Sequence, residues 1–195
     1  MSITSKRKYD QEAPPNYLCG KKDDSLKGIF PERIGSLNYQ YKQQYDDPSS
    51  GYRLRYEDGQ LFKVDIYVYD KGLSDIGTGI NGTQVKKEFE ELVQVFPLME
   101  EMGKYKDVKQ LEKGIFTDED DTLGFLWSRC QYRQSPNENV SYVGLRISET
   151  YLTAICGQLV KVRLTLKHKD YVDRKDDIAI FMVQFSKILI SQPAL

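Results

Sequence analysis

The sequence predicts an α+β protein in which an antiparallel β-sheet is covered by two amphipathic helices. Segments with alternating apolar and polar residues precede each of two longer segments whose apolar residues recur at helical spacing. The connections between the strand-like segments are of hairpin length, which requires antiparallel pairing. A helix with a single apolar stripe needs a sheet face to cover, so two such helices fit one sheet.

Three strand-like segments come first. Residues 36–46 and 52–56 alternate Tyr and Leu with polar neighbours. Residues 61–70 are the clearest strand, because their apolar residues share one face: Phe62, Val64, Ile66 and Val68. Asp58-Gly59, between the second and third segments, accepts the positive φ of a tight hairpin. Together they predict an antiparallel meander.

A helix is predicted at about 83–103, after a glycine-rich loop at 71–82. Its apolar residues are three or four positions apart and form one stripe: Val85, Phe89, Leu92, Phe96 and Met99. Four further strand-like pieces are predicted at 105–116, 122–135, 139–150 and 154–168. A second striped helix follows at about 174–191, with Asp173 as its N-cap.

The composition is that of an ordinary soluble globular protein, with 39% hydrophobic and 29% charged residues. The length fits one domain, placed at 29–195, behind a flexible N-terminal arm at 1–28 that carries two prolines and charged clusters. A formal net charge of -1 provides no bulk attraction to nucleic acid, so no nucleic-acid partner is expected.

No segment approaches the ~20 apolar residues of a membrane span. The N-terminus as written has no apolar signal segment. Two locations remain open: cytoplasmic, or periplasmic or secreted if a signal peptide has been removed.

The segment Gly77-Thr78-Gly79-Ile80-Asn81-Gly82 matches G-x-G-x-x-G. A dinucleotide site needs the first glycine directly after the strand and the third within the first turn of the helix. Here the first glycine lies well beyond Asp70 and the third precedes the helix, which favours a surface loop. The helix start at Thr83 remains a candidate for an anion or a partner's carboxylate. Gly77, Gly79, Gly82 and Thr83 are therefore candidate binding residues.

Tyrosines are the distinctive feature of the composition, with 14 in the chain. Tyrosine is enriched where one end of the ring is buried and the other is wet, which includes binding surfaces. Ordinary strand propensity explains the same enrichment. Tyr52, Tyr67 and Tyr69, in the first meander, are the candidate binding residues of this kind.

No catalytic residue, metal site or cofactor is predicted. His168 is the only histidine, and the P-loop, H-E-x-x-H and G-x-S-x-G patterns are missing from the sequence. Cys130 and Cys156 are expected to be small buried residues, and a disulfide between them is the alternative.

The order of elements resembles the PsbP/MOG1-like superfamily, which includes DcrB-like bacterial proteins. The resemblance is carried by Phe30-Pro31, by the strand pair around 52–56 and 64–69, by the helix at 85–102 and by the late strand 162–166 before the last helix. The stretch 67–73 is similar to uncharacterised bacterial envelope proteins. The resemblance implies an α/β/α sandwich and a binding or accessory role.

Two functions follow as hypotheses. The first is a non-catalytic binding or accessory protein that acts through protein–protein interaction, at a sheet edge, the 71–82 loop or the Tyr-rich meander. The second is an enzyme with a small-molecule pocket between helix and sheet, built on a Tyr/Asp/Arg constellation. A pocket with converging polar groups favours the second, and a flat exposed Tyr patch favours the first.

Overall fold

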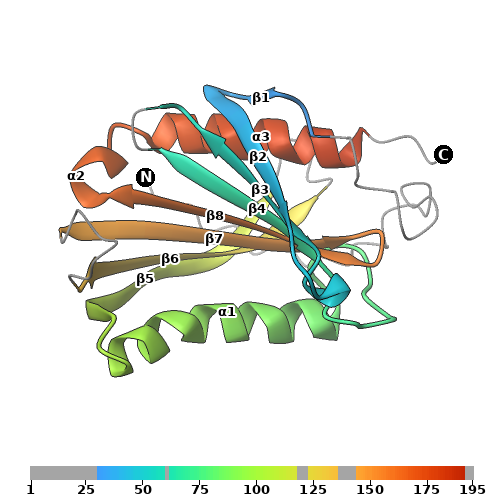
Figure 1. The fold of residues 1–195 in the computed structure, drawn as a ribbon, viewed down its shortest axis with the longest axis horizontal. Helices are drawn as coiled ribbons and strands as arrows, with labels where there is room; N and C mark the ends of the chain where they lie inside the picture. The colour runs from blue at the N-terminus through green and yellow to red at the C-terminus, as the bar shows by residue number, and fades with distance from the viewer. Residues whose placement is uncertain (1–29, 60–61, 118–122, 136–143, 192–195) are drawn as a thin grey trace, which may run out of the picture.

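A computed structural model describes residues 30–59, 62–117, 123–135 and 144–191. These residues form one antiparallel sheet in the order β1-β2-β3-β4-β8-β7-β6-β5, with α1 and α3 on opposite faces (Figure 1). The predicted α/β/α sandwich with an antiparallel sheet is confirmed. The arm predicted at 1–28 lies outside the described residues, and the single domain at 29–195 stays a prediction.

The elements follow the predicted order, strands then helix and again strands then helix. They are β1 (Arg33–Ile34), β2 (Leu37–Gln44), β3 (Tyr52–Glu57), β4 (Lys63–Tyr69), α1 (Thr83–Glu101), β5 (Tyr105–Thr117), β6 (Gly124–Gln134), β7 (Leu145–Ile155), β8 (Gln158–Lys167), α2 (His168–Tyr171) and α3 (Lys175–Ile190). A short 3₁₀ turn at Pro48–Ser50 lies between β2 and β3. No helix among the described residues combines the length and apolarity that a bilayer crossing needs.

The larger core lies between the sheet and α3. Alternate residues of β3, β4 and β8 point to this side, because successive side chains of a strand project to opposite faces. They include Leu54, Val64, Ile66, Val162 and Leu164, all buried. The α3 stripe meets them with Ile178, Phe181, Met182, Phe185 and Leu189. This is the stripe that the sequence predicts.

The opposite face of the sheet is covered unequally. Helix α1 packs against β5, β6 and β7. Val85 and Phe89 of its predicted stripe are buried there together with Val93, whereas Leu92 is only partly buried. Figure 1 shows α1 alongside the β5 end of the sheet. The strands β2, β3 and β4 lie at the other end of the sheet order. This unequal cover positions the candidate sites.

The boundary between the third and fourth late strands differs from the prediction. Strand β7 continues to Ile155, and the turn to β8 is Cys156-Gly157, with φ of 53° and 73°. A two-residue hairpin needs positive φ at its central residues, which Asn-Gly or Asp-Gly normally signals. Of Cys156-Gly157, only the glycine is typical of such a turn. The predicted break after residue 150 was therefore wrong, because a strand buried on both faces shows no alternation.

The start of the second helix also differs. Asp173 is not its N-cap, because α3 begins at Lys175 after Arg174, without a side-chain cap. The preceding residues form the short helix α2, which no sequence signal predicted. Asp176 and Asp177 do lie in the first turn of α3, where their charge complements the helix dipole.

Cys130 and Cys156 are both buried thiols, and no disulfide joins them. Cys130 lies on β6 and Cys156 in the β7–β8 turn. The expectation of small buried residues holds for this pair.

Candidate functional site

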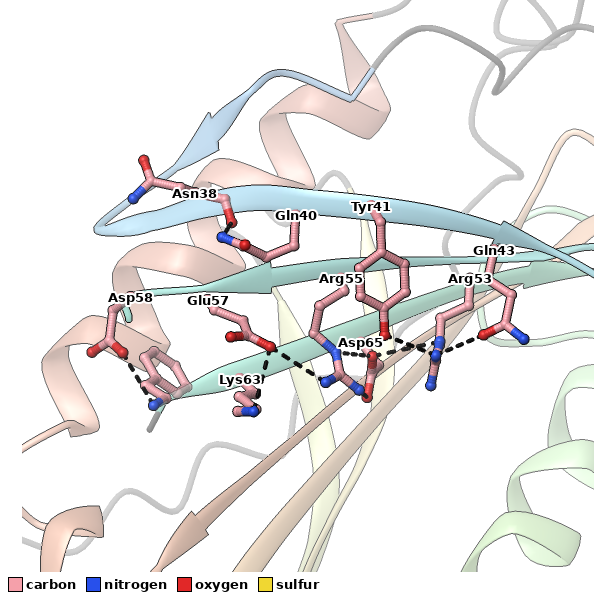
Figure 2. A network of polar contacts seen from close by, with 11 residues as sticks. Asn38, Gln40, Tyr41, Gln43, Arg53, Arg55, Glu57, Asp58, Lys63 and Asp65 are labelled. Atoms are coloured by element: carbon pink, nitrogen blue, oxygen red, sulfur yellow. Dashed lines mark hydrogen bonds and ion pairs between the residues drawn. The ribbon is translucent and has the colours of Figure 1, made fainter. Parts of the chain in front are cut away.

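A polar sheet face is formed by β2, β3 and β4 on the side opposite α3. On β3 and β4 its members alternate with buried residues, and on β2 its members are exposed residues that pair with Arg53 and Arg55. We call this the open sheet face: Tyr41, Gln43, Arg53, Arg55, Glu57, Lys63 and Asp65. Figure 2 shows these side chains across the three strands.

Arg55 and Asp65 form the centre of the open sheet face. Arg55 Nε donates to Asp65 Oδ1 at 2.7 Å and Arg55 Nη2 to Asp65 Oδ2 at 2.9 Å, a two-point contact. Such planar pairs are stronger than single hydrogen bonds and fix the orientation of the guanidinium. The arginine side chain is 18% exposed and the aspartate 17%. The pair is therefore a rigid, largely shielded platform rather than a mobile surface contact.

Arg53 extends this platform to β2. Its Nη2 donates to the Tyr41 hydroxyl at 3.0 Å and to Gln43 Oε1 at 2.7 Å, and its Nε lies 3.8 Å from Asp65. The Tyr41 ring is 42% exposed. The open sheet face therefore presents an exposed tyrosine over ordered arginines (Figure 2).

A pocket lies beside the open sheet face, where α1 meets the sheet. Its volume is about 520 Å³, within the range of small-molecule sites. We call it the α1 pocket, and it is lined by Tyr45, Asp47, Ser49, Ser50, Tyr67, Tyr69, Lys71, Glu88 and Lys161. It therefore draws on the β2–β3 connection, β4, α1 and β8.

Glu88 is a buried carboxylate on α1 at the wall of the α1 pocket. It accepts a hydrogen bond from the Tyr69 hydroxyl at 2.7 Å and forms an ion pair with Lys71. Burial, with the hydrogen bond to Glu88 next, raises the pKa of Tyr69 above its ordinary value. Tyr69 therefore stays neutral and serves as a donor that holds the carboxylate.

Lys161 enters the α1 pocket from β8. Its ammonium lies 3.9 Å from the centre of the Tyr67 ring and 5.6 Å from that of Tyr69. Burial, and next the charge of Arg163, lowers the pKa of Lys161 to about 8. Rings stabilise a cation through their quadrupole, but less than a carboxylate at contact does.

A second cavity, of about 320 Å³, lies on the α3 side. Its floor is Glu149, which is 1% exposed. Glu149 accepts from the hydroxyls of Tyr151 and Tyr171, each at 2.6 Å, and from Arg129 Nε at 2.7 Å. Arg129 also packs over the rings of Trp127 and Tyr171. Because these groups use their hydrogen-bonding capacity on one another, we interpret the cluster as a structural anchor that joins β6, β7 and α2.

The structure brings together two of the predicted binding residues and separates the others. Tyr67 and Tyr69 lie side by side in the α1 pocket. Tyr52 points to the α3 side and is buried in the core. Thr83 is exposed at the first position of α1.

The glycine loop is a third location, and it is tied to the sheet. Gly79 N donates to Ala154 O at 2.7 Å, and Ala154 N to Gly79 O at 3.3 Å. The Gly79 amide, which a phosphate would need, is used by this pairing. Gly82 precedes α1 without a side-chain cap, and Gly77 has open space where a Cβ would stand. The arrangement resembles an added strand segment rather than a phosphate cradle.

Three parts of these sites were not predicted from the sequence: Glu88, Lys161 and the grouping of the open-face arginines. Glu88 sits among charged helix residues, and only the pairing of β4 with β8, with Tyr67 opposite Lys161, shows that the lysine reaches the pocket. Tyr41, Asp65, Arg53 and Arg55 do lie together, but on the open sheet face and not in a pocket between helix and sheet, so the enzyme hypothesis stays a prediction.

Comparison with known proteins supplies little beyond this geometry. No family model matches the chain, and no curated protein matches it. Among solved structures, the chain is similar to that of cyanobacterial PsbP (CyanoP) from Synechocystis sp. PCC 6803, with a TM-score of 0.42 and 17% sequence identity. The match covers 82% of this chain and 96% of that one. The likeness to MOG1 and DcrB proteins stays a prediction. A similarity of this degree indicates nothing about the function of this chain.

Proposed function

We propose that the protein is a non-catalytic binding or accessory protein that acts through protein–protein interaction at the open sheet face. One observation carries the proposal: ordered arginines lie beneath an exposed tyrosine on a sheet region beyond the strands that α1 packs against. Tyr and Arg dominate the energetics of protein interfaces. Side chains held in place before binding lose less entropy on association.

The other predicted locations receive less support. The edge strand β5 pairs with β6 through two register irregularities and carries several lysines. Bulges and lysines are the devices by which sheet edges avoid pairing with other chains. The 71–82 loop is fixed to the sheet through Gly79 and through the buried Ile76.

The chemistry of the open sheet face points to a partner segment that carries carboxylates. Arg53, Arg55 and Lys63 outnumber the carboxylates of Glu57 and Asp65 on this face. Complementary charge speeds encounter and sets orientation. An acidic segment with apolar contacts to the Tyr41 ring fits this surface.

A photo-crosslinking experiment tests the proposal. Tyr41 is replaced by a photoreactive phenylalanine in cells that express the protein, and Val172, which is 66% exposed before α3, is replaced in the same way as the control. We expect a discrete protein adduct from position 41 and none in common with position 172. The adduct is lost with Arg53→Glu and kept with Arg133→Glu, an exposed arginine on β6. The same adducts from both positions would overturn the proposal.

The alternative function, a small-molecule enzyme with a pocket between helix and sheet, is favoured by the α1 pocket. The pocket lies between α1 and β4/β8 and combines tyrosines, a carboxylate and a lysine. Mass spectrometry of a bound ligand before and after incubation discriminates the two. A chemically changed ligand supports the enzyme, and an unchanged one supports binding alone.

A further inference from the structure

The charges of the α1 pocket are unevenly paired. Glu88 is held by Lys71 and by the Tyr69 hydroxyl, and Lys71 also contacts Glu91 at 2.8 Å. At the other wall Asp47 accepts from the Ser49 hydroxyl at 2.7 Å and from the Ser49 amide at 2.9 Å. Both carboxylates of the pocket are therefore already bonded within the protein.

Lys161 lacks such a counter-charge. Within the described chain no carboxylate lies within ion-pair distance of its ammonium, whose printed contacts are the faces of Tyr67 and Tyr69. The charged groups that act on it from β8, β4, α1 and the β4–α1 loop are Arg163, Asp65, Glu88 and Lys71. The two cations oppose its charge, and the two carboxylates are each bonded to other cations.

A cation drawn out of water without a paired anion costs free energy, and a ligand that supplies the anion recovers it. A buried lysine avoids this cost when it loses its proton, and the pKa of Lys161 is lowered accordingly. The rings of Tyr67 and Tyr69 beside the ammonium add an apolar wall. A flat organic body with one negative group matches this combination of charge and ring surface.

We propose that the α1 pocket binds a small organic anion, a carboxylate or a phosphate monoester carried on a flat ring, with the Lys161 ammonium as its counter-ion and Tyr67 and Tyr69 as its apolar wall. The inference does not depend on the protein partner at the open sheet face. Its residues Lys161 and Tyr69 are outside that surface, so the two proposals fail separately.

Calorimetric titration tests the inference with benzoate, phenyl phosphate and inorganic phosphate as probes. At pH near 7 we expect saturable binding of benzoate or phenyl phosphate, weakened at least about tenfold in Lys161→Gln. Lys113→Gln is the matched control, because Lys113 pairs with Glu90 on the outside of the molecule. We expect the Lys113→Gln variant to bind the organic probes with unchanged affinity. Preference between the two organic probes identifies the anionic group.

The following results would overturn the inference. If inorganic phosphate binds as tightly as phenyl phosphate, Tyr67 and Tyr69 do not contribute to binding as an apolar wall, and the proposed ligand class is wrong. Absence of binding by any probe up to about 10 mM, or equal affinity in Lys161→Gln, rejects the site. Affinity also falls between about pH 7 and pH 9.5 if Lys161 is the counter-ion, because its pKa is about 8.

A second measurement remains if Lys161→Gln does not fold. Acetic anhydride labels lysines through their neutral amines, so at pH near 8 Lys161 reacts faster than its exposure alone predicts. Phenyl phosphate at saturating concentration slows the labelling of Lys161, read by peptide mass spectrometry, and leaves that of Lys113 unchanged. Equal labelling with and without the probe rejects the inference.

Discussion

Replacement of Glu149 by alanine tests whether the buried cluster on the α3 side anchors the fold. Glu149 is 1% exposed and is the shared acceptor of Tyr151, Tyr171 and Arg129. Without it, two hydroxyls and a guanidinium lose their acceptor in a desolvated place. Breaking a buried ion pair by removing one partner costs about 3–5 kcal/mol.

The structure places the cost at the lower end of that range. Arg129 keeps Glu112 of the neighbouring strand β5 as a partner at 2.9 Å, and the adjoining cavity of about 320 Å³ admits water to the two hydroxyls that lose their acceptor. We therefore expect a loss of about 3 kcal/mol. For a chain of this size each kcal/mol lowers Tm by about 2–4 °C, which gives a drop of about 6–12 °C.

Thermal unfolding followed by circular dichroism provides the assay. The control is Arg133→Ala, which removes an ion pair to Asp107 whose side chains are both more than half exposed. Exposed pairs contribute about 0–1 kcal/mol, so this variant shifts Tm little. If Glu149→Ala lowers Tm no more than Arg133→Ala does, the cluster is not the anchor that we describe.

Three further predictions concern backbone strain, a buried charge and a buried thiol. Gly51→Ala places a Cβ 1.9 Å from the Val68 carbonyl oxygen at φ 60°, so we expect a much lower urea midpoint than for Gly59→Ala, where φ is also positive but space is open; equal midpoints would contradict the clash. Lys161→Met raises the free energy of unfolding at pH 7 by an amount on the order of 1–3 kcal/mol, and Tm rises with it. Because the folded state holds the Lys161 proton less tightly than the unfolded state, the advantage shrinks as pH rises from about 8 towards 10.5, and a constant difference in Tm would refute the cause. Burial raises the pKa of the Cys130 thiol to about 11; a thiol reagent at pH 8, followed by peptide mass spectrometry, therefore labels Cys130 far more slowly in the native state than in urea, and equal rates would show that the site is open.

The alternation of residues predicted most of the sheet. Strand β4 has the predicted faces, since Val64, Ile66 and Val68 are buried and Lys63 and Asp65 point the other way. Alternation succeeds here because one side of the strand meets the core and the other meets polar groups. It fails for β7, where nine consecutive residues from Ile147 to Ile155 are buried and the period of two disappears.

The candidate sites were predictable only in part, because they are assembled by pairing between distant strands. Tyr67 and Tyr69 were singled out from the sequence as meander tyrosines. Their contact with Lys161 follows from the β4–β8 ladder, and that with Glu88 from the packing of α1, neither of which leaves a local signature. The network of Arg53 and Arg55 has no local signature either, because it joins residues of three strands.

The ladder between β4 and β8 also constrains how the chain reaches its native state. It is the junction between strands β1–β4 and strands β5–β8 in the sheet order, and Lys63 meets Thr165 across it. The chain must close a loop of roughly 100 residues before the β4–β8 ladder contributes any stabilising free energy. This requirement slows folding. During synthesis, the edge of β4 stays unpaired and its apolar side stays uncovered until β8 and α3 emerge from the ribosome. Chaperone dependence of newly made chains is therefore expected to end only when residues 158–190 are released.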